Sequence, residues 1–136
     1  MDIALCCIEE VDDTHVKVEF TGAKRSLYYI AKGSHELKEL KGDRKSIGGF
    51  RRRKVAFTKS EVILEKGSKI YLTTDGYGDQ HGPNTIKIGS KRVQMLLEQY
   101  AHLSMEAQAN AMLDYLYQHQ KGVQQRDDML ILGITI

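Results

Sequence analysis

The hydrophobic and polar positions in the first two-thirds of the chain follow the period of β-strands. Residues 3–8 form a continuous apolar run, which predicts a strand buried on both faces. Residues 15–20 alternate, with Val16, Val18 and Phe20 on one face and charged side chains on the other. Further strand patterns, separated by Gly-containing or Asp-containing turns, cover residues 26–31, 36–40, 57–64 and 69–74.

The last third changes to the period of helices. Ser90 and Ser104 are candidate N-caps, each followed by apolar residues at helical spacing. These residues are Val93, Leu96, Leu97 and Tyr100 in the first helix, and Met105, Ala109, Met112, Leu113 and Leu116 in the second. Residues 129–136 are almost all apolar and predict a central strand. Strands, two helices and a returning strand indicate the α+β class, with mostly antiparallel β-sheet layers and flanking α-helices.

Composition places the chain among ordinary globular domains. Its 136 residues suffice for one domain, over residues 1–136, and 41% are hydrophobic and 28% charged. The net charge of +2, together with basic residues that lack interleaved aromatics, argues against a nucleic-acid partner. No apolar run reaches the roughly 20 residues of a membrane span, so we expect no membrane contact and a cytoplasmic location. Adjacent Cys6 and Cys7 point to opposite strand faces, and we expect two small buried thiols in a reducing compartment.

Acidic residues lie next to two predicted buried strands, after the end of one and before the start of the other. Asp75 follows Thr74 at the end of one strand and precedes Gly76, whose missing side chain lets a ligand approach. We expect the Asp75 carboxylate to be buried there, which is costly without a cationic partner. Asp127 and Asp128 directly precede the last strand, and a divalent cation would relieve their repulsion. Oxygen ligands favour Mg²⁺ or Mn²⁺, although a plain turn and a solvated loop explain the same residues.

Five stretches resemble the SpoIIE-type phosphatases, the bacterial branch of the type-2C (PPM-type), metal-dependent family of protein serine/threonine phosphatases. They are residues 1–6 (MDIALC), 20–30 (FTGAKRSLYYI), 41–49 (KGDRKSIGG), 66–77 (KGSKIYLTTDGY) and 125–131 (QRDDMLI). The resemblance implies part of an αββα phosphatase sandwich. It also implies hydrolysis of phosphoserine or phosphothreonine by a water bridged between two Mn²⁺ or Mg²⁺ ions, without a covalent phosphoenzyme.

The resemblance also assigns roles to individual residues. Asp75 and Asp127 each match a ligand of one of the two metal ions, and Asp79, in the following loop, matches an accessory metal position. Gly76 would lie beside the metal through its backbone, and Thr74 and Asp128 would support the ligands. No catalytic residue is expected beyond the metal ligands.

One part of the family pattern has no counterpart in the chain. The family's site also needs an aspartate followed by a Gly-His-Gly segment and a helix, which this sequence lacks. Asp2 matches a different position of the pattern. We therefore expect a domain truncated at its N-terminus, with weak metal binding and uncertain activity.

The resemblance and its gap lead to several expectations about partners. The family acts in bacterial signal transduction, which implies a phosphoprotein substrate, such as an anti-sigma-factor antagonist, and an upstream sensory domain. The missing core segment would leave apolar surface for a homodimer.

Two alternative functions remain open. They are a non-catalytic regulatory or dimerisation fragment with the same fold, and an unrelated acidic metal-binding module. We expect the basic run at residues 51–54 to be a solvated loop rather than a phosphate-binding site, and His81 to be a surface residue.

Overall fold

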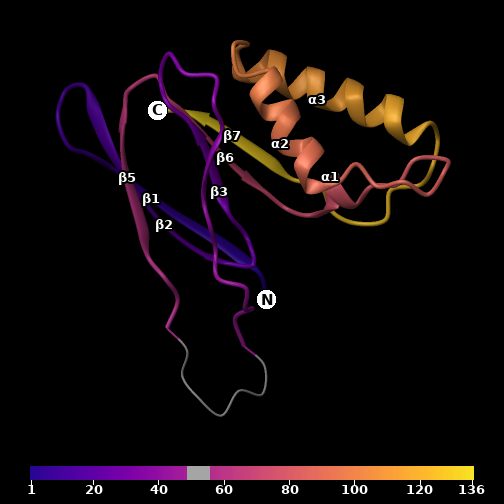
Figure 1. The fold of residues 1–136 in the computed structure, drawn as a ribbon, viewed down its shortest axis with the longest axis horizontal. Helices are drawn as coiled ribbons and strands as arrows, with labels where there is room; N and C mark the ends of the chain where they lie inside the picture. Colours follow the sequence, from indigo (N-terminus) through magenta and orange to yellow (C-terminus); the bar gives the residue numbers. More distant parts are fainter. Residues whose placement is uncertain (49–55) are drawn as a thin grey trace.

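A computed structural model describes residues 1–48 and 56–136 and shows two antiparallel sheets with a layer of helices (Figure 1). The first sheet has the strand order β1-β2-β5, and the second has the order β4-β3-β6-β7. The strands are β1 (Ile3–Glu10), β2 (His15–Ala23), β3 (Leu27–Ile30), β4 (Lys38–Leu40), β5 (Ser60–Glu65), β6 (Lys69–Thr73) and β7 (Ile131–Thr135). The helices are α1 (Gly76–Asp79), α2 (Ser90–Gln99) and α3 (Met105–Gln120). The predicted α+β class is confirmed. The basic run predicted at residues 51–54 lies outside the described residues.

The core between the sheets is built from the alternating face of β2. Val16, Val18 and Phe20 are buried, as their spacing predicts, and they pack in one cluster with Leu64 of β5 and Ile70 of β6. Burying a side chain of this kind contributes about 1.5–3 kcal/mol. This face therefore holds the two sheets together and fixes the position of β6, the strand that leads into the predicted site.

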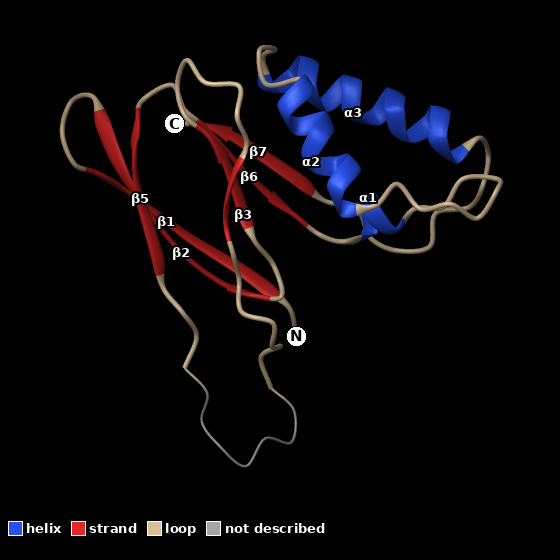
Figure 2. Cartoon of the chain, viewed as in Figure 1, coloured by secondary structure: helices blue, strands red, loops and turns tan. Residues whose placement is uncertain are grey.

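The helices α2 and α3 cover the second sheet and lie on the side away from the first (Figure 2). Ser104 caps α3 as predicted, since its side chain accepts a hydrogen bond from the Ala107 N–H at 3.2 Å. Ser90 is not a cap. It is the first residue of α2, and Gly89, at φ 81°, occupies the N-cap position, because the chain enters this helix through a left-handed conformation that glycine adopts freely.

Two buried tyrosines attach α3 to the rest of the fold. The Tyr71 hydroxyl in β6 donates to Oε1 of Gln108 at 3.0 Å, and the Tyr77 hydroxyl in α1 donates to the Met112 carbonyl at 2.7 Å. Burial raises the pKa of both tyrosines. The packing of α3 thus depends on polar contacts as well as on its apolar stripe.

The strands at the outer edges differ from the sequence prediction. β1 was expected to be buried on both faces, but it lies at the end of its sheet, and Leu5 is 61% exposed. β7 was expected to be central, but it ends the described second sheet, and Leu132 is 44% exposed. Cys7 is exposed and Cys6 is only partly buried, so the expectation of two buried thiols was wrong. An apolar run shows that a strand can be buried, but the strands and helices packed beside it determine whether it is buried.

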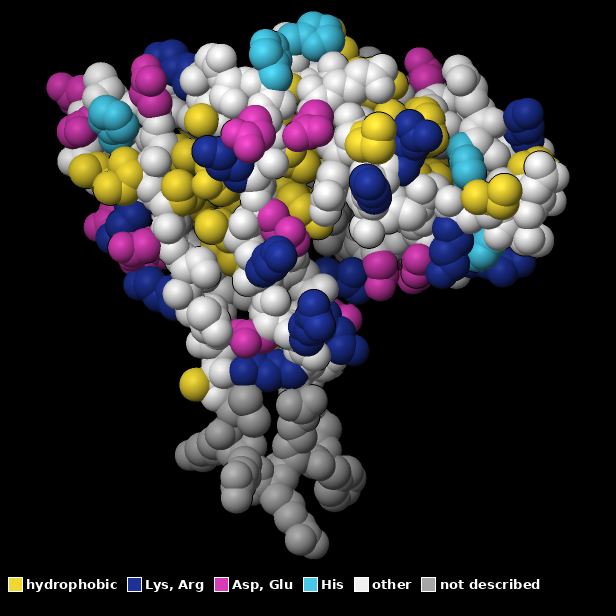
Figure 3. Space-filling model, viewed as in Figure 1, with side chains coloured by type: hydrophobic (Ala, Val, Ile, Leu, Met, Phe, Trp, Pro, Cys, Tyr) yellow, Lys and Arg dark blue, Asp and Glu magenta, His cyan; other side chains and the backbone are white. Residues whose placement is uncertain are grey.

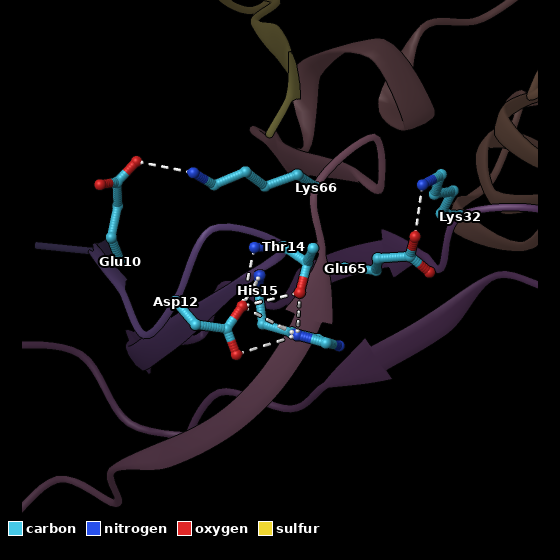
Figure 4. Close-up of polar contacts among 7 residues, drawn as sticks. All are labelled: Glu10, Asp12, Thr14, His15, Lys32, Glu65 and Lys66. Atoms are coloured by element: carbon cyan, nitrogen blue, oxygen red, sulfur yellow. Dashed lines mark hydrogen bonds and ion pairs between the residues drawn. The ribbon is translucent and has the colours of Figure 1, made fainter.

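The turn between β1 and β2 is one of the Asp-containing turns that separate the predicted strands, and Asp12 holds it (Figure 4). Its Oδ1 accepts hydrogen bonds from the Thr14 N–H at 2.7 Å and the His15 N–H at 2.8 Å. Ion pairs of Lys66 with Glu10 and of Lys32 with Glu65 surround the same end of the sheets. Within residues 1–48 and 56–136, none of the helices combines the length and the apolar character that crossing a bilayer requires.

Candidate functional site

The end of β6 and the segment before β7 meet at one corner of the second sheet. The Thr74 N–H donates to the Leu130 carbonyl at 2.9 Å, and the Leu130 N–H donates to Thr74 Oγ1 at 2.9 Å. Thr74 Oγ1 also donates to the Asp128 carbonyl at 3.0 Å. Thr74 thus connects two segments that are distant in sequence, since Thr74 and Asp128 lie 54 residues apart.

Gly76 completes this corner through a close approach of the two backbones. A Cβ atom at Gly76 would lie 2.3 Å from the Asp128 carbonyl oxygen and 3.4 Å from the Asp127 carbonyl carbon. Only a residue without a side chain allows this contact. The structure therefore brings the Asp75-Gly76 and Asp127-Asp128 segments together, and we call the place where they meet the acidic corner.

Asp75 lies at the start of the short helix α1, a helix that the sequence pattern did not predict. Its carbonyl accepts the Asp79 N–H at 2.8 Å, and its carboxylate Oδ2 accepts a hydrogen bond from Arg25 Nη2 at 2.8 Å. The Arg25 guanidinium lowers the pKa of Asp75 below its usual value. The expectation of a buried carboxylate was wrong, because the Asp75 side chain is 51% exposed.

The other predicted acids lie around this corner. Asp79 is in α1, rather than in a loop, and its Oδ1 pairs with Lys87 Nζ at 3.0 Å. Asp127 is exposed; its Oδ1 accepts the Asp128 N–H at 2.8 Å, and its carbonyl accepts from Gln125 Nε2 at 2.8 Å. These contacts fix the Asp127 backbone and one of its carboxylate oxygens.

A cavity of about 240 Å³ opens beside Asp75 and Asp79. The remaining lining includes the cationic residues Lys24 and Arg25 and the polar residues Ser26, Tyr28, Ser90 and Gln94. Carboxylates and cations thus share one hollow, a combination that suits both a cation and an anionic group. His81, expected at the surface, lies outside this lining, and its Nδ1 is buried.

Arg25 and Asp2 were missed as site residues by the sequence analysis. Arg25 Nη2 lies 2.8 Å from Asp75 Oδ2 and 3.4 Å from Asp2 Oδ2. Asp2 Oδ1 also accepts from the Ser46 hydroxyl at 2.6 Å, and this hydrogen bond is the largest cause of the lowered pKa of Asp2. No local signal marks these residues, because the pairing of β1 with β2 brings Asp2 to Arg25, and the pairing of β3 with β6 brings Arg25 to Asp75.

The donors at the corner suit a hard cation in kind but are too few for a complete site. Asp75, Asp79 and Asp127 offer carboxylate oxygens, the ligands that Mg²⁺ and Mn²⁺ prefer. However, in the part of the chain that the structure describes, no three Asp, Glu, His or Cys side chains converge closely enough to hold a metal ion. Any metal bound at this corner therefore needs ligands in addition to the carboxylates as they stand.

Comparisons with solved structures agree on one fold. The SiaA-PP2C domain of Pseudomonas aeruginosa is 36% identical, with a TM-score of 0.77, over 88% of this chain and 46% of that one. The phosphatase domain of the cell fate determinant SpoIIE from Bacillus subtilis (Mn presoaked) is 14% identical, with a TM-score of 0.63, over 99% and 56%. A bacterial serine phosphatase bearing an R161E mutation is 14% identical, with a TM-score of 0.51, over 96% and 53%. This chain spans about half the length of the structures it matches.

The family comparison covers nearly the whole chain. No curated protein sequence matches it. Residues 2–136 match the family described as Stage II sporulation protein E (SpoIIE). Together with the two sheets, the helix layer and the acidic corner, this match shows that the chain belongs to the SpoIIE family of phosphatase domains.

Proposed function

We propose that this chain contributes to a metal-dependent protein serine/threonine phosphatase that hydrolyses phosphoserine or phosphothreonine. The observation that carries the proposal is the contact between Gly76 and Asp128, which brings the two acidic segments of the family pattern to one corner. Asp75 and Asp127 would be the principal ligands of Mn²⁺ or Mg²⁺, and Asp79 an accessory one. The bound cations would supply charge neutralisation at the phosphate and a water of lowered pKa.

The chain's own residues prepare this corner for a phosphorylated substrate. Gly76 keeps the backbone open, while Thr74 holds the Asp128 carbonyl in place. Lys24 and Arg25 line the cavity beside Asp75 and offer positive charge to a phosphoryl group. The polar side chains Ser90 and Gln94 complete a lining suited to the side chain of a phosphorylated residue.

We further propose that the remaining metal ligands come from residues outside this chain. The described carboxylates are too few for a two-ion centre, and the matched structures are about twice as long. Apolar side chains that would normally be covered are also exposed at the edge of β7. The substrate would be a phosphoprotein of a bacterial signalling system, with an anti-sigma-factor antagonist as one candidate and an upstream sensory domain as regulator.

The direct test is hydrolysis of a phosphoserine peptide and of p-nitrophenyl phosphate, with and without Mn²⁺, by a longer form of the protein that includes the residues supplying the remaining ligands. We expect Asp75→Asn and Asp127→Asn to lower Mn²⁺-stimulated turnover by about a hundredfold or more, since even residues that only support ligands give losses of 10–100-fold. Asp114→Asn, an exposed change on α3, is the matched control and should leave turnover unchanged. Turnover that is insensitive to Mn²⁺, or equal losses in all three variants, would contradict the proposal.

A second candidate function is that of a non-catalytic module that dimerises. It is favoured by a cavity of about 450 Å³ between α3 and β7, lined by apolar residues such as Met112, Leu116 and Ile131. Hydrophobic side chains also gather in the middle of the face shown in Figure 3, with charged side chains around them. A stable dimer without any Mn²⁺-dependent hydrolysis would favour this second function.

A further inference from the structure

Arg25 is held at the acidic corner by a tightly built loop between β2 and β3. A Cβ atom at Gly22 would lie 2.1 Å from the Arg25 carbonyl oxygen, and one at Gly42 would lie 2.0 Å from it. Lys24 adopts the left-handed conformation at φ 56°, which costs a non-glycine residue free energy. The backbone of Arg25 is therefore wedged between two glycine-bearing segments, and this fixes the origin of its side chain.

A second pair of hydrogen bonds locks this loop. The Lys24 N–H donates to the Asp43 carbonyl at 2.7 Å, and the Asp43 N–H donates to the Gly22 carbonyl at 2.8 Å. Because Gly42 is next to Asp43 in the chain, these hydrogen bonds hold both Gly22 and Gly42 against the Arg25 carbonyl. The position of Arg25 is thus fixed by the strained backbone of Lys24, by the close approaches at Gly22 and Gly42, and by these two hydrogen bonds.

The Arg25 side chain bridges two carboxylates. Its Nη2 lies 2.8 Å from Asp75 Oδ2 and 3.4 Å from Asp2 Oδ2, and the side chain is only 20% exposed. The other oxygen of Asp2 accepts from the Ser46 hydroxyl, so this carboxylate is also held in place. One guanidinium therefore contacts two carboxylates, so Arg25 does not neutralise both of them.

We propose that Arg25 is a positioning residue for Asp75: it binds Oδ2, and thereby orients the carboxylate so that Oδ1 is available to a divalent cation. This inference rests on the proposed function. A carboxylate that ligates a metal is normally held by a hydrogen-bond donor, and loss of that donor weakens metal binding. The planar guanidinium suits this task because its donors have a fixed geometry. The opposite role, a cation that competes with the metal for Asp75, would make removal of Arg25 strengthen metal binding.

The experiment is an Mn²⁺ titration of the ¹⁵N-labelled chain, followed by the paramagnetic broadening of the Gly76 and Asp128 amide signals, which detects weak sites. We expect Arg25→Gln to need about tenfold more Mn²⁺ or more for the same broadening. Arg25→Lys keeps a cation but loses the fixed fork, so it should lie between Arg25→Gln and the wild type. The matched control is Lys32→Gln, which removes the same charge from the Lys32–Glu65 pair shown in Figure 4 and should behave as the wild type.

The outcomes separate this inference from the proposed function. If the wild type shows broadening at Gly76 and Asp128 but Arg25→Gln needs the same amount of Mn²⁺ or less, Arg25 is not a positioning residue and the metal site stands. If the wild type shows no broadening at either amide, Asp75 does not bind Mn²⁺ in this chain and this inference is wrong, whereas the proposed function, which takes further ligands from outside the chain, is decided by the turnover assay. Thermal unfolding of each variant checks the fold. Should Arg25→Gln fail to fold, Arg25→Lys decides, and a wild-type Mn²⁺ requirement in that variant overturns the proposal.

Discussion

At the scale of single residues, Gly76 decides whether the two acidic segments meet. A Cβ atom there would lie 2.3 Å from the carbonyl oxygen and 2.8 Å from the carbonyl carbon of Asp128. These are backbone atoms that cannot move aside as the end of a flexible side chain does. The site thus depends on a residue that contributes no functional group of its own.

Gly76→Ala should therefore push the two segments apart. We expect a loss of about 1–3 kcal/mol in the free energy of unfolding, measured by urea denaturation, because the added methyl overpacks a closed contact. Gly78→Ala, two residues later in α1, is the control, since its nearest neighbour would be the Ser90 nitrogen at 3.5 Å, an ordinary contact. Equal stability of the two variants would show that the corner is looser than the structure indicates.

Asp12 gives a residue-scale prediction about pH. Its pKa lies below the ordinary value of 3.8, chiefly because the Thr14 hydroxyl donates a hydrogen bond to its carboxylate. A lowered pKa in the folded protein contributes stability above 3.8 that is lost as the pH falls further. Asp12→Ala should thus be less stable than the wild type at neutral pH, and this difference should shrink below pH 3.8. Thermal unfolding across this range is the measurement, Asp13→Ala is the control, and a difference independent of pH would refute the role of the ionised carboxylate.

At the scale of elements, the starts of α2 and α3 show that both the capping residue and the path of the chain determine where a helix begins. Ser104 and Ser90 are the same residue type before similar apolar stripes, yet only Ser104 accepts a backbone hydrogen bond as an N-cap. At α2, the left-handed Gly89 sets the boundary one residue earlier. The same signal therefore has different structural consequences at the two helices.

Alanine substitutions at the two serines should separate these roles. Ser104→Ala should lower the free energy of unfolding by about 1 kcal/mol, because it removes the acceptor for the Ala107 N–H. Ser90→Ala should change stability by less than about 0.5 kcal/mol, since alanine suits a helix interior at least as well. Equal losses in urea denaturation would mean that Ser90 also acts as a cap in solution.

At the scale of the whole molecule, apolar side chains are exposed along the edge of the second sheet at β7. Leu132 is 44% exposed in this strand, and Leu113 is 45% exposed on α3 beside the apolar cavity. An edge strand with apolar side chains offers unpaired backbone groups and hydrophobic surface together, and such strands favour association. The further residues proposed above to supply metal ligands, or a second copy of the chain, would cover this edge.

We therefore expect the chain to self-associate in proportion to its concentration in sedimentation velocity experiments. Leu132→Lys should shift the population toward the monomer, because a charge on an edge strand opposes pairing. Ile63→Lys, at an exposed apolar position in β5 of the first sheet, is the control and should have a smaller effect. A wild-type chain that stays monomeric at every concentration would show that the open edge is tolerated in isolation.

The sequence by itself determined the features that depend on near neighbours. The alternation of Val16, Val18 and Phe20 predicted a strand with one buried face, and Ser104 marked the start of a helix. The Asp-Gly and Asp-Asp pairs identified the segments that meet at the corner. These features are readable because side-chain period, caps and turns are set by residues within a few positions of one another.

Only the tertiary structure decided the exposure of each strand and the partners of each carboxylate. β1 and β7 read as buried strands but lie at the edges, since burial depends on which strands are present beside them. Arg25 reaches Asp75 across 50 residues of sequence because β3 pairs with β6. Such contacts leave no local pattern, since the free energy that favours them comes from the packing of whole sheets rather than from the residues in contact.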